Sequence, residues 1–65
     1  MKPNYALKAT IISRYGSQVR FDQEVKISEL RLSRLIYCRS MATVEERRII
    51  SEKLGVPEIE IFPAN

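Results

Sequence analysis

The fold of this chain is decided by residues 17–36, which read SQVRFDQEVKISELRLSRLI. Within them, Phe21 and Val25 are spaced i, i+4 and so share one face of a helix. The i, i+3, i+4 spacing of a second helix is found in Leu32, Leu35 and Ile36. The stretch therefore predicts two short helices with a very short connection between them.

Polar residues at the start of each predicted helix support this interpretation. Ser17 and Ser28 stand where each helix needs an N-cap, because a serine hydroxyl can accept a hydrogen bond from an otherwise unpaired backbone N–H. Ile27 lies between the helices, where it can fill the angle between them. Two helices joined so closely cannot run antiparallel over much length, so we expect them to cross steeply.

The pattern Ser17-Gln18, Phe21, Ile27-Ser28, Leu32-Ser33 and Leu35-Ile36 resembles the helix-turn-helix of the lambda-repressor-like family, the Cro/CI-type regulators. The match is close over this motif and looser over nearly the whole chain. The resemblance implies an all-α fold, a compact bundle of four to five short helices containing a helix-turn-helix. It further implies that residues 1–65 form a single DNA-binding domain.

Two positions depart from the family pattern. Asp22 stands where the family usually has Ala, and Lys26 stands where it usually has Gly. Because a buried, unpaired carboxylate is costly, we expect Asp22 to pair with a neighbouring Arg or Lys, or the helices to sit slightly apart. Lys26 is expected to take a left-handed backbone at a strain of roughly 1 kcal/mol.

Capping signals predict two further helices outside the motif. Asn4 can cap a first helix over residues 5–15, and Gly16 is well placed to end it. Thr43 and Glu46 have the spacing of a capping box at the start of a fourth helix. Residues 39–42, between the third and fourth helices, are expected to form a loop.

The closing segment, LGVPEIEIF at residues 54–62, is ambiguous. Its isoleucines alternate with glutamates, which is the period of a strand, whereas Ile59 and Phe62 also fit one turn of a helix. On the resemblance, we predict a short fifth helix with Pro57 at its first position. Pro63 is expected to end that helix.

Charge is distributed unevenly along the chain. Residues 1–39 carry eight basic and three acidic side chains, a net charge of +5, whereas residues 40–65 carry −2. A basic half that contains the predicted helix-turn-helix favours a polyanionic partner, here double-stranded DNA. A solvated surface with a chance asymmetry would give the same charges.

Composition argues against several other classes of protein. The chain has 65 residues and one cysteine, Cys38, so it is expected to be a single domain without an internal disulfide in a reducing cytoplasm. The family resemblance implies that the chain is encoded by a bacterium or a phage. No apolar run approaches the roughly 20 residues of a membrane span, and we expect no membrane partner. Because histidine is absent, we expect no metal, no cofactor and no enzymatic activity.

The outward face of the third helix, predicted from about Glu29 to Tyr37, is the candidate reading surface. With the apolar face turned inward, Leu30, Arg34 and Tyr37 point outward. Arg34 is the strongest candidate for a base contact, because a guanidinium can bind guanine O6 and N7 together. Leu30 fits a contact with a thymine methyl, with a partner protein or with the core that flanks the helix. The predicted DNA-contacting residues are Ser17, Gln18, Arg20, Ser28, Glu29, Leu30, Arg31, Ser33, Arg34, Tyr37 and Arg39.

The resemblance assigns roles to several of these positions. Gln18 matches the residue that contacts the DNA backbone and supports the reading helix. Glu29 and Arg31 match positions near base edges or phosphates, whereas Tyr37 and Arg39 suit phosphates at the helix exit. For each exposed arginine, the alternative is a solvated charge without a partner.

The leading interpretation is a sequence-specific transcriptional regulator of Cro/CI type that binds as a homodimer. Ile59, Ile61 and Phe62 are the candidate dimer surface, and their alternative role is to close the core of the monomer. A second interpretation is a protein-interaction module, such as an adaptor, antirepressor or antitoxin-like partner, with weak or no DNA binding. Asp22 and Lys26, which depart from the family pattern, motivate that alternative, together with Glu29 and the exposed Leu30 on the third helix.

Overall fold

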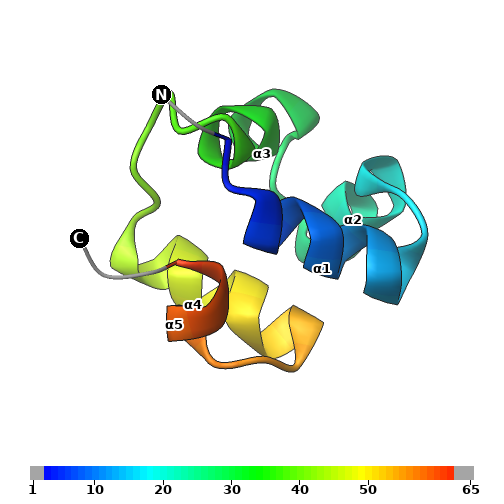
Figure 1. Ribbon diagram of the computed structural model, residues 1–65. Coiled ribbons are helices and arrows are strands. Elements are labelled where there is room, and N and C mark those ends of the chain that lie inside the picture. Colours follow the sequence, from blue (N-terminus) through cyan, green and yellow to red (C-terminus); the bar gives the residue numbers. More distant parts are fainter. Residues whose placement is uncertain (1–2, 63–65) are drawn as a thin grey trace.

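The computed structural model describes residues 3–62, and all the regular secondary structure in that range is helical (Figure 1). The helices are α1 (Tyr5–Tyr15), α2 (Gln18–Val25), α3 (Glu29–Ile36), α4 (Val44–Leu54) and α5 (Glu58–Ile61). The prediction of an all-α bundle of four to five short helices is therefore confirmed. The strand alternative for the closing segment is wrong, because α5 is helical.

The predicted boundaries need two small corrections. Tyr37 is the C-cap of α3 rather than its last helical residue. Pro57 is the N-cap of α5 rather than its first helical residue, and its backbone is extended (φ −63°, ψ 147°). The predicted role of Pro63 falls outside the described residues.

The predicted caps hold the starts of the first four helices. Asn4 Oδ1 accepts from the backbone N–H of Leu7 at 3.1 Å. Ser17 Oγ accepts from Arg20 at 3.2 Å, and Ser28 Oγ accepts from Arg31 at 3.1 Å. At α4, Thr43 and Glu46 form the reciprocal capping box. Each cap satisfies a backbone donor that the helix itself leaves unpaired.

Residues with a left-handed backbone conformation lie just before and just after α3. Lys26, at the end of α2, has φ 59°, which confirms the predicted left-handed backbone. Cys38 also has positive φ (57°), which the sequence did not reveal. Beyond α3, the N–H of Arg39 donates to Arg34 O and that of Cys38 to Leu35 O, a Schellman arrangement. A single left-handed non-glycine residue costs roughly 1–2 kcal/mol, so these hydrogen bonds help offset strain.

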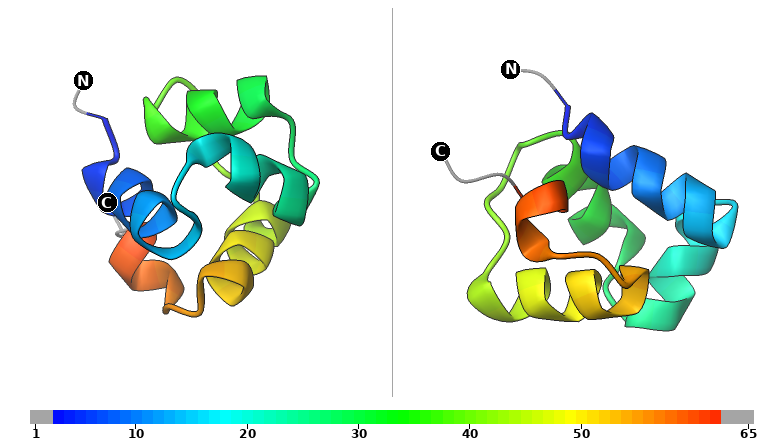
Figure 2. Two further views of the ribbon diagram at one scale, coloured as in Figure 1. Left: turned by 90° about the vertical axis from the view of Figure 1, so that its right-hand side faces the viewer. Right: turned by 60° about the horizontal axis from the view of Figure 1, so that its bottom comes forward.

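All five helices meet in one apolar core. Its buried members are Leu7, Ile11, Phe21, Val25, Leu32, Leu35, Ile36, Ile50, Leu54 and Ile61. In Figure 1, α1 runs between α3 on one side and α4 with α5 on the other, and Figure 2 shows α5 beside both α1 and α4. From α4, Ile49 packs against the edge of this core, whereas Val44 is 74% exposed.

Two polar side chains connect segments that are distant in sequence. Asn4 Nδ2 donates to Ile61 O at 2.6 Å, and the backbone N–H of Asn4 donates to Ile36 O, so one residue joins the ends of α3 and α5 to the start of α1. The Tyr15 hydroxyl donates to Lys53 O at 3.0 Å, and its ring meets Phe21 edge to face at 4.9 Å. These contacts fix both ends of α1 against the other helices.

Asp22 is buried on α2. It is 8% exposed, and within residues 3–62 neither of its carboxylate oxygens accepts a hydrogen bond. The expectation that Asp22 pairs with a neighbouring Arg or Lys is therefore wrong. Burial raises the pKa of Asp22 above its ordinary value, and the negative charge of Glu29 raises it further.

Replacing Asp22 with Ala is expected to stabilise the protein by about 1–2 kcal/mol at pH 7. Because the pKa is raised in the folded state, the unfolded chain loses the proton first as pH rises, and the wild-type protein then loses stability. The gain should therefore be large at pH 7 and small at pH 3. Urea denaturation at both pH values measures it.

Glu24→Ala is the matched control, because it removes a carboxylate from an exposed position of the same helix. Its effect should remain within about 0.5 kcal/mol, as is usual for surface substitutions. If Asp22→Ala is destabilising at pH 7, the buried carboxylate is compensated in solution by a positive charge or a hydrogen-bond donor.

Candidate nucleic-acid interface

The two faces of α3 differ sharply in exposure. Leu32 and Ile36 are fully buried and Leu35 is 3% exposed, whereas Leu30 is 64% and Tyr37 43% exposed. Arg34 is exposed on the same outward side. The predicted orientation of this helix is therefore confirmed, since its apolar side joins the core and Arg34 faces solvent.

Arg34 is free to bind a partner from outside the bundle. Its guanidinium forms no ion pair or hydrogen bond with any other residue in the range 3–62. Ser33, the neighbour of Arg34 in the sequence, and Cys38, which follows α3, are half-buried. A guanidinium in this setting retains all five of its N–H donors for an external acceptor.

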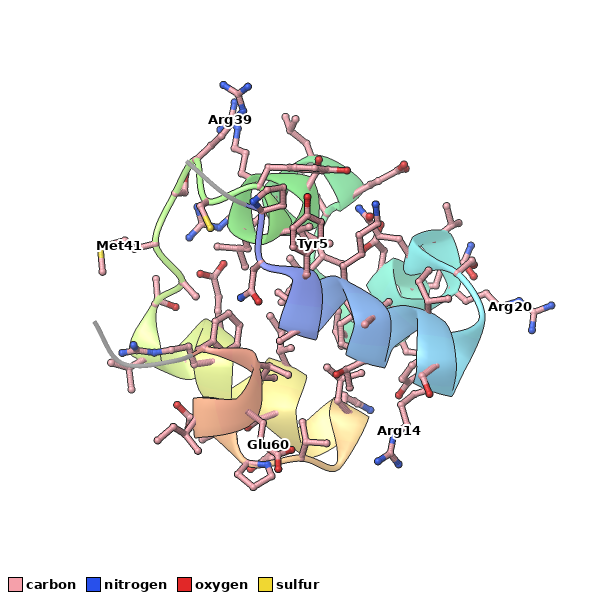
Figure 3. The ribbon with its side chains drawn as sticks, in the orientation of Figure 1. Tyr5, Arg14, Arg20, Arg39, Met41 and Glu60 are labelled. Carbon is pink, nitrogen blue, oxygen red and sulfur yellow. The ribbon has the colours of Figure 1, made fainter. Side chains whose placement is uncertain are left out.

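The start of α2 and the exit of α3 supply further polar groups. Ser17 and Gln18 are half-buried, and Ser28 and Glu29 are exposed. The side chains of Arg20 and Arg39 extend away from the bundle, from α2 and from beyond α3 respectively (Figure 3). The predicted residues thus come from one contiguous part of the chain but do not form a single compact cluster.

Arg31 has a partner inside the protein. Its Nε donates to Glu46 Oε2 at 2.8 Å, its Nη2 to Glu46 Oε1 at 2.7 Å and to Met41 O at 3.1 Å. Glu46 Oε1 also accepts from the backbone N–H of Thr43 at 2.8 Å. Arg31 therefore joins the first turn of α3 to the loop and to the start of α4, and most of its donors are already used.

The Arg31–Glu46 pair is partly shielded from solvent. The two side chains are 30% and 18% exposed, and the hydrogen bonds from Arg31 lower the pKa of Glu46 to about 2. Two parallel charge-assisted hydrogen bonds are stronger and more directional than an ordinary surface ion pair. The sequence showed Glu46 only as a capping residue, because no local signal links positions 15 residues apart.

Lys8 is a basic residue that the sequence prediction left out. It belongs to α1, yet its Nζ lies 3.5 Å from the hydroxyl of Tyr37 and 5.8 Å from the centre of that ring. Only its position outside the buried face of α1, which carries Leu7 and Ile11, could have marked Lys8 as exposed. The fold thus places one more cation beside the outward face of α3.

The predicted dimer residues separate into different environments. Ile61 is fully buried, so its assignment to a dimer surface is wrong and its role is to close the monomer's core. Phe62 is half-buried and also packs against the core. Ile59 is 69% exposed and is the one of the three that faces solvent extensively.

No family model, curated protein or solved structure matches this chain. Within the described range, no group of three His, Cys, Asp or Glu residues is arranged to hold a metal ion. None of the helices seen between residues 3 and 62 has the length and apolar content needed to cross a bilayer.

Glu46→Gln is expected to lower the free energy of unfolding by about 1–2 kcal/mol at pH 7, because it neutralises one partner of a charge-assisted pair. The pKa of Glu46 is depressed in the folded state, so the pair's contribution is complete above the ordinary value of 4.5 and is lost as pH falls towards 2. The difference in free energy of unfolding between Glu46→Gln and the wild type should therefore shrink as the pH falls from 4.5 towards 2. Chemical denaturation at pH 7 and pH 3 measures it.

The neighbouring pair of Glu45 and Arg48 provides a control. Its atoms are 3.3 Å apart, and the side chains are 73% and 53% exposed. Glu45→Gln should therefore change stability by less than about 0.5 kcal/mol. Equal effects of the two substitutions would show that the Arg31–Glu46 pair has no special role.

Proposed function

We propose that this protein is a sequence-specific DNA-binding regulator of transcription in which α3 enters the major groove. The observation that carries the proposal is the outward face of α3, where Arg34 is exposed and unpaired while the opposite face is buried. An eight-residue helix held in this way has a free surface of the kind that reads base edges. The helix-turn-helix resemblance of residues 17–36 supports the same assignment.

Basic residues around α3 are suited to the phosphate backbone. Arg20 and Arg39 extend from α2 and from the exit of α3, where they can set the register of α3 on the duplex (Figure 3). Arg31 has the role of holding α3 rather than reading DNA, because Glu46 occupies its guanidinium. Base discrimination is then carried chiefly by Arg34 and Leu30.

The proposed binding unit is a homodimer on a pseudo-palindromic site. One α3 helix contacts only about one half-site, and useful affinity for such a small module normally requires two. Ile59 on α5 supports this assembly, since it is a large apolar side chain that the core does not use.

A protein-interaction module remains the second candidate. It is favoured by the exposure of Leu30 (64%) on the same face as Arg34, and by the acidic Glu29 in the first turn of α3. A carboxylate at that place repels phosphate, and an exposed leucine suits an apolar protein surface. DNA selection distinguishes the two candidates.

Selection from a random pool of DNA duplexes should enrich one half-site, repeated with two-fold symmetry. Arg34→Ala should relax the preference at one base pair and weaken binding to the selected site by roughly 1–3 kcal/mol. Fluorescence anisotropy with the selected duplex and single-base variants measures both effects. The control is Arg48→Ala, on the exposed side of α4.

The outcomes separate the two candidates. If no sequence is enriched by the wild-type protein, the regulator assignment fails and the interaction module takes its place. If a site is enriched but Arg34→Ala keeps the same base preference, then DNA reading stands and Arg34 is not one of the reading residues.

Ile59→Asp should abolish dimer formation while leaving the monomer folded, because a 69%-exposed side chain contributes little to the core. Sedimentation equilibrium measures the assembly, and circular dichroism checks the fold. Val19→Asp is the matched control: Val19 is 50% exposed on α2, which does not pack against α5. A dimer that survives Ile59→Asp would place the dimer surface elsewhere.

A further inference from the structure

The ammonium of Lys8, on α1, and the phenol of Tyr37, at the end of α3, lie in contact with each other. The backbone N–H of Asn4 donates to Ile36 O, which fixes the start of α1 against the end of α3. Four residues further along α1, Lys8 reaches across to Tyr37, with Nζ 3.5 Å from the hydroxyl oxygen. The contact joins residues 29 positions apart, so it exists only because α1 packs against the exit of α3.

Some hydrogen-bond donors of Lys8 and Tyr37 are not used by the contact between them. A lysine ammonium has three N–H donors, and the contact with Tyr37 uses one of them. Because the Tyr37 oxygen accepts that bond, its own O–H remains free to donate. Both side chains are exposed, so an anion arriving from solvent can be bound by the ammonium and the hydroxyl together.

The surrounding charges favour an anion. Residues 3–21 and 30–44, which include all of α1 and the exit of α3, contain no acidic residue. No ion pair holds Lys8 within the part of the chain that the structure describes. The side-chain contact that Lys8 makes in that range is with the neutral phenol of Tyr37, which carries no charge to offset that of the ammonium.

The face of α1 that carries Lys8 is open to solvent. Tyr5, Lys8, Ala9, Ile12 and Ser13 lie together on this face. Tyr5 and Ile12 are 64% and 45% exposed there, and Tyr5 is labelled in Figure 3. A strand of nucleic-acid backbone can therefore approach Lys8 from solvent.

We infer that Lys8 and Tyr37 together bind one backbone phosphate of the DNA duplex, which extends the interface from α3 onto α1. The inference rests on the proposed DNA binding and names a residue of α1 that positions the duplex. Lys8 carries no sequence information in this role, because a phosphate is the same at every base pair. Its effect is on affinity and on salt dependence.

The test is a salt titration of the full chain with the duplex obtained by selection. Each phosphate contact contributes about 0.9 to the slope of log affinity against log salt concentration. Lys8→Ala should flatten that slope by about this amount and should leave the base preference unchanged. Lys8→Arg should keep the wild-type slope, whereas Tyr37→Phe, which removes only the hydroxyl donor, should weaken binding at every salt concentration.

Arg14→Ala is the matched control, because it removes one positive charge from the same helix. In Figure 3 the Arg14 side chain points away from Tyr5, at the far end of α1. Arg14→Ala should leave the slope of log affinity against log salt concentration at its wild-type value. Thermal unfolding of all four variants checks that each is folded.

Each outcome decides a separate point. If the wild type selects a site but Lys8→Ala keeps the full slope, the phosphate contact is refuted and the proposed function stands. An equal flattening by Arg14→Ala and Lys8→Ala would also refute it, since the effect would reflect net charge alone. If the wild type binds no duplex selectively, the proposed function fails first and the phosphate contact fails with it.

Discussion

The structure depends on the burial of one face of α3. A helix of eight residues has little stability in isolation, because the cost of nucleating it is spread over too few hydrogen bonds. Leu32, Leu35 and Ile36 overcome that cost by joining the core that all five helices share. Their burial also sets the rotation of α3, and so determines which side chains face solvent.

Polar contacts then fix the two ends of this helix. At its start, Arg31 connects α3 to Glu46 on α4, and the same carboxylate belongs to the capping box of α4. At its end, Ile36 O accepts from Asn4, which also contacts Ile61 O. Both ends of α3 are therefore held by residues that cap another helix. Displacing α3 would therefore break hydrogen bonds made by the residues that cap α1 and α4.

The least favourable features of the chain gather near α3. Lys26 and Cys38 adopt left-handed backbones just before and just after it, and Asp22, on the helix that precedes it, is buried with no hydrogen-bond partner among residues 3–62. Such unfavourable conformations and burials are retained only where many surrounding contacts hold them in place. Their concentration at one helix agrees with the proposal that α3 has a task beyond stability, as local departures from folding rules tend to occur at functional sites.

The sequence by itself determined the helices, because their signals act over three or four residues: the i, i+3, i+4 spacing of apolar side chains and the caps at Asn4, Ser17, Ser28 and Thr43. It likewise determined that Arg34 faces away from the core. Only the tertiary structure decided that Arg31 pairs with Glu46, that Lys8 meets Tyr37, and that Ile61 is buried while Ile59 is exposed. Those contacts join separate helices, and periodicity within one helix carries no information about which neighbour will lie against it.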